Sequence, residues 1–180
     1  EAVKEHVGIE LDVHLTSDGK AVVFHDDTLT RMCHRDEIIE KMSYTDLQNC
    51  YLNHTSEKIP LLSEVLSYVD GRVPLLIELK LPSASTKLCQ EAKLLASYHG
   101  RYLIQSFNTI GLFWFRRHFP HILRGQLSSN LTKTRKAEPW IFCFLVRFLL
   151  LNWIGKPDFI SYKFKDRTNS SLRILKSLFR

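Results

Sequence analysis

Short apolar runs recur along the chain, and longer runs with a helical period lie between them. The short runs predict strands, because apolar stretches of this length bounded by turn residues suit a buried sheet. We expect strands at residues 7–15, 21–26, 73–80, 101–107, 121–127 and 157–163. We expect helices at residues 61–69, 85–100, 109–120, 139–155 and 170–180. The repeated order of strand and helix predicts an α/β fold with a largely parallel sheet.

The first two predicted strands are joined by a connection too short for a crossover helix, LTSDGKA. Asp18-Gly19 is a strong signal for a two-residue hairpin loop. With that loop, Asp12 faces His25 across the ladder and Glu10 lies two residues away on the same face. One face of the hairpin is therefore expected to carry two acids and an imidazole, and His25 is a candidate for proton transfer.

The strand at 73–80 also carries charge within an apolar pattern, with Glu78 and Lys80 on one face. Together, Glu10, Asp12 and Glu78 form an all-oxygen ligand set that suits Mg²⁺ or Ca²⁺, whereas zinc favours histidine or cysteine. In an α/β barrel such residues converge on one mouth. The alternative is a solvated stripe of acids paired with lysines, in which Lys80 is a structural ion-pair partner.

Composition adds little to this pattern. A chain of 180 residues with 44% hydrophobic and 24% charged residues has the profile of one ordinary soluble domain. The net charge of +6 suits an anionic partner, but the charges are scattered. Residues 31–60 mix short patterns and are expected to pack on the outside. The four cysteines show no metal-binding spacing and are expected to be reduced thiols: Cys33, Cys50, Cys89 and Cys143.

The most hydrophobic segment is residues 140–154, which falls short of the roughly 20 residues needed to span a bilayer. Its flanking Trp140 and Trp153 suit a helix that rests on a membrane surface. Basic residues precede it at Lys133, Arg135 and Lys136. The plainer interpretation is a buried barrel helix or a dimer face.

Aromatic residues alternate with arginines at 113–125, a composition that also occurs in nucleic-acid binding. A helix with an apolar inner face and a cationic outer face explains this stretch more simply. We therefore expect no nucleic-acid partner.

Taken together, these motifs resemble the glycerophosphodiester phosphodiesterase family. The family's E-x-D, its T-x-D-G turn and its H-D pair correspond to residues 10–12, 16–19 and 25–26, and its E-L-K strand to residues 78–80. The later stretches QSFN, RGQL and PDFISYK are similar to later strands of bacterial members.

The resemblance implies a TIM-type barrel, of which residues 1–180 supply one partial domain with about six of the eight strands. It implies hydrolysis of small-molecule glycerophosphodiesters to sn-glycerol 3-phosphate and an alcohol. In such an enzyme Glu10, Asp12 and Glu78 hold a divalent metal, Mg²⁺ or Ca²⁺. His25 matches one catalytic histidine, and Lys80 matches the lysine beside the phosphate.

The chain also departs from the family pattern. The family's first strand, with a His-Arg pair, and its last strand have no counterpart here, so we expect a fragment that lacks the second catalytic histidine and is inactive alone. Targeting signals cannot be judged from such a start, which leaves a cytoplasmic or membrane-associated location. Two alternatives stay open. One is a related barrel phospholipase, such as a lysophospholipase D, a phosphoinositide phospholipase C or a sphingomyelinase D. The other is a catalytically incomplete membrane-surface module.

Overall fold

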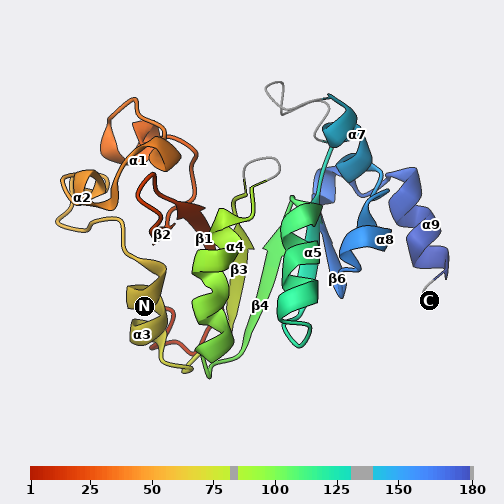
Figure 1. Ribbon diagram of the computed structural model, residues 1–180, viewed down its shortest axis with the longest axis horizontal. Coiled ribbons are helices and arrows are strands. Elements are labelled where there is room, and N and C mark those ends of the chain that lie inside the picture. The colour runs from red at the N-terminus through yellow and green to blue at the C-terminus, as the bar shows by residue number, and fades with distance from the viewer. Residues whose placement is uncertain (82–84, 131–139, 179–180) are drawn as a thin grey trace. The chain divides into compact units, whose positions relative to one another are not determined.

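The computed structural model describes residues 1–81, 85–130 and 140–178 (Figure 1). It divides into two compact units, Glu1–Ile104 and Gln105–Arg180. All six predicted strands are present: β1 (Ile9–Leu15), β2 (Ala21–Val23), β3 (Leu75–Leu79), β4 (Tyr102–Ser106), β5 (Arg124–Ser128) and β6 (Phe159–Tyr162). The prediction of an α/β fold is therefore confirmed.

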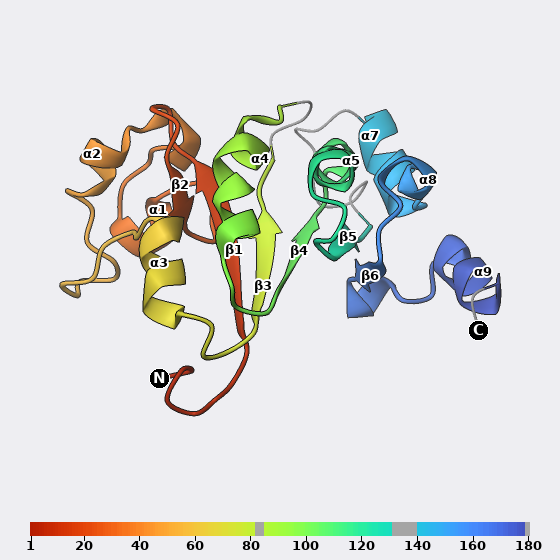
Figure 2. The same cartoon turned by 60° about the horizontal axis from the view of Figure 1, so that its bottom comes forward.

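In the first unit the strand order is β2-β1-β3-β4. Strand β1 runs antiparallel to β2 and parallel to β3. Helix α3 (Leu62–Val69) packs against β2, and helix α4 (Lys87–Glu91) packs against β1 (Figures 1 and 2). The 3₁₀ helix η2 (Ala92–Ser97) follows α4 directly, so the helix predicted at 85–100 is two shorter helical segments.

Strand β1 is buried on both faces along its centre. Leu11 and Val13 point to one face, and Asp12 and His14 to the other, and all four are buried. A strand between two neighbours in a parallel sheet is normally covered on both sides. Asp12 is therefore buried because β1 is central, and a buried carboxylate requires a partner.

The prediction of a two-residue loop between β1 and β2 is wrong. The observed pairs are Val13 with Val23 and Leu15 with Ala21, so the register differs by one residue from the expected one. The Thr16 N–H donates to the Lys20 carbonyl, which leaves a three-residue loop in which Gly19 has a φ of +78°. That left-handed conformation favours glycine and is typical of three-residue hairpin loops.

Residues 31–60 pack outside the strands, as predicted, with short helices around a small core that they share with β2 and the residues after it. These helices are α1 (Thr30–Cys33), η1 (Ile39–Lys41) and α2 (Tyr44–Leu47). The core contains Val22, Phe24, Leu29, Ile39, Met42, Leu47, Cys50 and Ile59. All four cysteines of the chain are free thiols, and only Cys33 is not fully buried.

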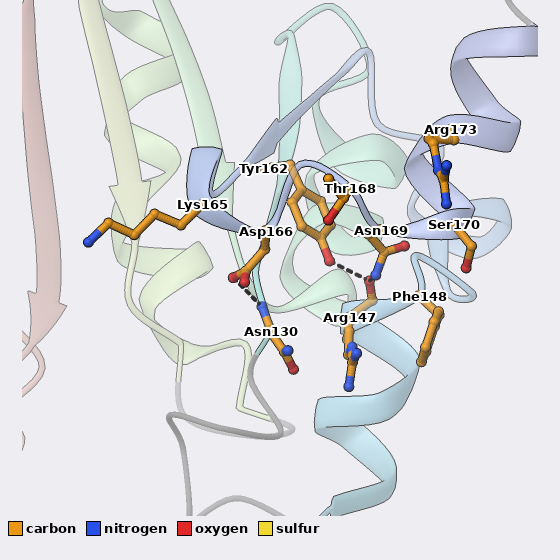
Figure 3. Close-up of a pocket in the computed structure, with 10 residues that line it drawn as sticks. All are labelled: Asn130, Arg147, Phe148, Tyr162, Lys165, Asp166, Thr168, Asn169, Ser170 and Arg173. Carbon is orange, nitrogen blue, oxygen red and sulfur yellow. Dashed lines mark hydrogen bonds between the residues drawn. The ribbon is translucent and has the colours of Figure 1, made fainter.

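In the second unit the order is β4-β5-β6, and β5 and β6 are parallel. Gly125 pairs with Phe159, and a Cβ on Gly125 would overlap the Phe159 ring, so this close approach favours glycine. Helix α5 (Thr109–His118) packs against β5 with Leu112 and Phe115 buried. A cavity of about 530 Å³ lies beyond the last residues of β5 and β6 (Figure 3).

The QSFN and RGQL motifs connect the end of β4 to β5. The Gln126 side-chain amide donates to the carbonyls of Ser106 and Phe107 at 3.2 and 3.1 Å, and its oxygen accepts from the Thr109 hydroxyl at 3.0 Å. Asn108 caps the first turn of α5 with its side-chain oxygen. These motif residues therefore have a structural role in the second unit.

The prediction of one helix at 139–155 is wrong, because the chain forms two shorter helices there. Helix α7 (Trp140–Arg147) is followed by α8 (Asn152–Gly155), and Leu149 between them has a φ of 59°. The Leu150 N–H donates to the carbonyl of Leu145, five residues back, so the regular α-helical ladder ends there. The chain continues through β6 into η3 (Phe164–Asp166) and α9 (Ser170–Leu178). Lys133, Arg135, Lys136 and Pro139 lie outside the described residues.

Among the described strands, β2 pairs only with β1 and β6 only with β5. In the parts of the chain that the structure describes, no helix has the length and hydropathy required to cross a bilayer.

Candidate active site

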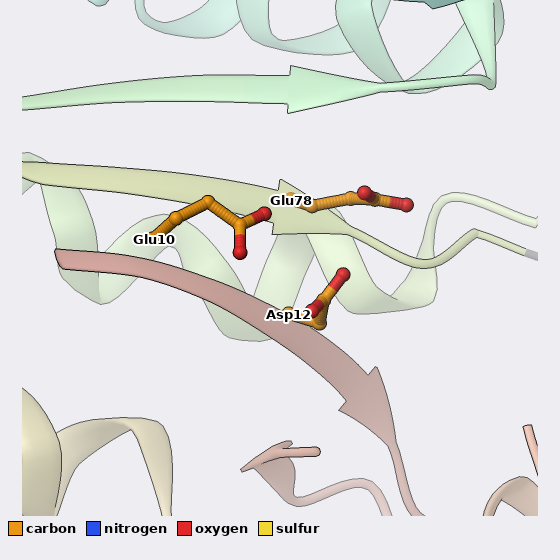
Figure 4. A group of neighbouring side chains, drawn as sticks. All are labelled: Glu10, Asp12 and Glu78. Carbon is orange, nitrogen blue, oxygen red and sulfur yellow. The ribbon is translucent and has the colours of Figure 1, made fainter. Parts of the chain in front are cut away.

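Three carboxylates from β1 and β3 lie together on one face of the first unit (Figure 4). The parallel register places Asp12 directly beside Glu78 and Glu10 beside Leu76. Because side chains alternate along a strand, Glu10 lies on the same face as Asp12. One carboxylate oxygen from each of the three residues lies within 4.8 Å of the others. The convergence predicted from sequence is therefore present.

Two of these acids are buried and share one lysine. Asp12 is 6% exposed and Glu78 7% exposed, whereas Glu10 is exposed. The Lys80 Nζ lies 2.8 Å from Asp12 Oδ1 and 2.8 Å from Glu78 Oε1. The solvated stripe considered from the sequence is thus wrong for Asp12 and Glu78, but its ion pair with Lys80 is present.

The three carboxylates face only one positively charged group among the contacts described, the Lys80 ammonium. Burial raises the pKa of Glu10, and repulsion by Asp12 and Glu78 raises it further. Burial also raises the pKa of Glu78, although Lys80 opposes that change. Burial acts to lower the pKa of Lys80, but its hydrogen bonds to Asp12 and Glu78 and their charges raise it instead, so Lys80 stays protonated.

The donor set fits a hard divalent cation. It consists only of carboxylate oxygens, which Mg²⁺ and Ca²⁺ prefer, and these oxygens are close enough to share one ion. A single ammonium group faces three carboxylates, so a cation would relieve the repulsion that remains. Among the described residues no other group of three histidine, cysteine or acidic side chains is placed in this way.

His25 does not face Asp12 across the ladder, because β2 ends at Val23 and the register is shifted. Its side chain is 71% exposed. Burial is the main influence on the pKa of Glu10, but the charge of His25 also acts on it and lowers it. His25 therefore lies within the electrostatic field of the acidic group, although not at the predicted position.

Sequence reasoning missed two residues that position His25. Asp26 contacts His25, and Arg31 contacts Asp26. The His25 Nδ1 lies 2.6 Å from Asp26 Oδ1. Asp26 in turn accepts hydrogen bonds from Arg31 Nε at 2.6 Å and Arg31 Nη2 at 3.1 Å, and these bonds lower the pKa of Asp26. The H-D pair in the sequence was a signal for Asp26, but Arg31 lies five residues further on and gave none.

Several known proteins are similar to this chain in sequence or in structure. Residues 1–164 match the model of the "Glycerophosphoryl diester phosphodiesterase family". A glycerophosphodiester phosphodiesterase of Bacillus altitudinis is 31% identical over 137 residues, covering 69% of this chain and 56% of the relative. One of Caldanaerobacter subterraneus is 30% identical over 145 residues, covering 74% of this chain and 58% of the relative. The chain thus spans little more than half the length of these relatives.

Solved structures share the fold. A phosphodiesterase of Oleispira antarctica, determined with its product sn-glycerol-3-phosphate, has a TM-score of 0.74 at 21% identity, covering 98% of this chain and 70% of that one. A glycerophosphodiester phosphodiesterase of Thermotoga maritima has a TM-score of 0.67 at 21% identity with the same coverage. With the family model matched over most of its residues, this chain belongs to the glycerophosphoryl diester phosphodiesterase family.

Proposed function

We propose that the protein hydrolyses glycerophosphodiesters to sn-glycerol 3-phosphate and an alcohol, with a divalent cation held by Glu10, Asp12 and Glu78. The observation that carries this proposal is the register of β1 and β3, which sets Asp12 beside Glu78 with Glu10 on the same face. Family membership and the product bound to the Oleispira antarctica phosphodiesterase support the same reaction.

The proposed roles follow from charge and position. A bound Mg²⁺ or Ca²⁺ would neutralise negative charge on the phosphoryl group. Lys80, protonated beside the acids, offers a positive charge to a phosphate oxygen. A bond forms between water and phosphorus while the bond from phosphorus to the alcohol oxygen breaks. His25 exchanges the proton that water loses and the alcohol oxygen gains.

Because this chain is expected to be inactive alone, the direct test is hydrolysis of glycerophosphocholine by this chain joined to the family's first and last strands, followed by separate assays for glycerol 3-phosphate and phosphocholine. We expect glycerol 3-phosphate, loss of product with EDTA, and recovery when Mg²⁺ or Ca²⁺ is added in excess. Release of phosphocholine instead would indicate cleavage on the other side of phosphorus, as in a phospholipase C. Product formation that EDTA leaves unchanged would contradict the proposed cation site.

Asp26 is proposed to be a positioning residue for His25. We expect Asp26→Asn to lower kcat about tenfold to a hundredfold, because the imidazole loses the charged acceptor that orients it and stabilises its protonated form. KM and the affinity for the cation stay close to those of the unmodified protein, since no proposed metal ligand changes. The matched control is Asp36→Asn, a nearby acid that accepts from the Thr30 hydroxyl. Equal losses in both variants would refute a role specific to Asp26.

A membrane-surface contact through residues 140–154 is also proposed. Trp140 is 73% exposed and Trp153 is 74% exposed, although tryptophan is highly buried on average. Trp140 begins α7, Trp153 lies on α8, and Arg147 ends α7. Exposed tryptophans with a basic residue suit the interface of a bilayer, and lysophospholipids are then further candidate substrates. A cytoplasmic or membrane-associated location remains a prediction.

This contact predicts sedimentation with vesicles. We expect the protein to bind vesicles of phosphatidylcholine with phosphatidylserine, and Trp140→Ser with Trp153→Ser to weaken binding about tenfold or more, because two interfacial anchors are lost. Tyr68→Ser, at an exposed aromatic position of α3 in the first unit, serves as the control. If the double variant binds vesicles as well as the control does, this segment is not the membrane contact.

A further inference from the structure

The second unit contains a cavity that the proposed hydrolysis does not use. It has a volume of about 530 Å³, within the range of small-molecule sites. Tyr162, which lines it, is the last residue of β6, and Asn130 follows the end of β5 by two residues. In α/β sheets, ligands bind beyond the carboxyl ends of parallel strands, which is where this cavity lies.

The lining of the cavity is cationic. Arg147, Lys165 and Arg173 contribute positive charge, and the one lining acid, Asp166, accepts a hydrogen bond from the Asn130 N–H at 2.9 Å. Figure 3 shows Arg147 and Arg173 on either side of the segment at 169–170, whereas the Lys165 side chain points away from both. Within the described ranges of the chain, neither Lys165 nor Arg173 forms an ion pair.

The wall that carries these charges is held in place by hydrogen bonds. The Tyr162 hydroxyl donates to the Arg147 carbonyl at 2.9 Å, and the Asn169 amide donates to the same carbonyl at 3.3 Å. The Asn169 side-chain oxygen accepts from the Ser171 N–H at 2.9 Å at the start of α9. The Arg147 guanidinium lies over the Phe148 ring at 5.0 Å. The end of α7, the end of β6 and the start of α9 are thus connected before any ligand arrives.

We propose that this cavity binds the phosphate group of a phosphate ester. Arginine recognises phosphate oxygens through several N–H groups, and Arg147 and Arg173 come from different elements that converge on one space. Thr168 and Ser170 add hydroxyl groups to the lining, which suits an ester whose alcohol part is also polar. The ester is either free in solution or the headgroup of an anionic lipid.

This inference is independent of the proposed hydrolysis, because every lining residue belongs to the second unit and none is a proposed metal ligand. The test is titration of the whole chain by calorimetry with inorganic phosphate and with glycerol 3-phosphate, in EDTA. We expect saturable binding, and we expect Arg173→Gln to weaken it about tenfold, since one charge-assisted contact is lost.

The matched control is Lys176→Gln, which removes the same charge from α9 at a residue that does not line the cavity. We expect its affinity to change by less than about twofold, because exposed charges are screened at physiological salt. An equal loss in both variants would mean diffuse attraction by a basic surface and would overturn the proposal.

Vesicles distinguish the two sources of phosphate. Binding of glycerol 3-phosphate in solution identifies a free ester as the ligand. Binding to vesicles that contain phosphatidic acid, with none to glycerol 3-phosphate or to phosphatidylcholine vesicles, and with loss in Arg173→Gln, identifies a lipid headgroup. If the protein binds none of these probes while it remains folded, the cavity is not a phosphate site.

Discussion

Asp12→Asn is expected to weaken the binding of Mg²⁺ or Ca²⁺ by roughly a hundredfold, which corresponds to about 2.8 kcal/mol. Asp12 lies beside Glu78 in the register of β1 and β3, so it belongs to the centre of the acidic group. An amide keeps the shape of the side chain but loses the charge that a hard cation requires. Hydrolysis of glycerophosphocholine is expected to fall by about 10² to 10³. Calorimetric titration with each cation and a product assay measure the two effects.

The control for this variant is Asp27→Asn, which removes an exposed carboxylate from the segment after β2. Its side chain is not part of the acidic group, so both cation affinity and hydrolysis should remain as in the unmodified protein. Lys80 still pairs with Glu78 in Asp12→Asn, which favours a folded variant. A folded Asp12→Asn protein with unchanged cation affinity would place the metal elsewhere.

Lys80→Met is expected to lower the free energy of unfolding in EDTA by about 3 kcal/mol. The Lys80 ammonium is the group that compensates Asp12 and Glu78, both of them buried, and methionine retains the apolar stem without the charge. A divalent cation should reverse the loss, since a ligand present at about 100 times its Kd adds about 2.7 kcal/mol. Urea unfolding with EDTA and with added Mg²⁺ or Ca²⁺ measures both changes.

Lys93→Met, at an exposed position of η2, is the control for Lys80→Met and should change the unfolding free energy by no more than about 0.5 kcal/mol. Glycerophosphocholine hydrolysis by Lys80→Met should remain low even when the cation restores stability, because the charge offered to the phosphate is absent. A Lys80→Met protein that is as stable as the control in EDTA would show that the acids need no compensation from this lysine.

The acidic group could be predicted from sequence because it depends on local rules. The alternation of side chains in a strand places Glu10 with Asp12 and Glu78 with Lys80, whatever the rest of the fold does. The order of strands and helices indicated an α/β fold, in which β1 and β3 become parallel neighbours. The observed pairing of Asp12 with Glu78 brings these two local patterns together.

Other features depended on a choice between local conformations that contacts from distant residues help to make. The hairpin loop has three residues rather than two because the Thr16 hydroxyl donates to Asp18 at 2.6 Å and accepts from the Lys20 N–H at 2.8 Å. Asp18 also accepts from the Tyr44 N–H, in a segment far along the chain. This change of one residue in register separates His25 from Asp12, because successive side chains alternate between faces.

The sequence by itself thus determined the strands, the α/β class and the parity of Glu10, Asp12, Glu78 and Lys80, since these follow from local alternation and apolar spacing. Only the tertiary structure decided the register of β1 and β2, the ion pair between Asp26 and Arg31 and the interruption between α7 and α8. The physical reason is that several local conformations have similar energies, and packing and hydrogen bonds between residues distant in the chain select one of them.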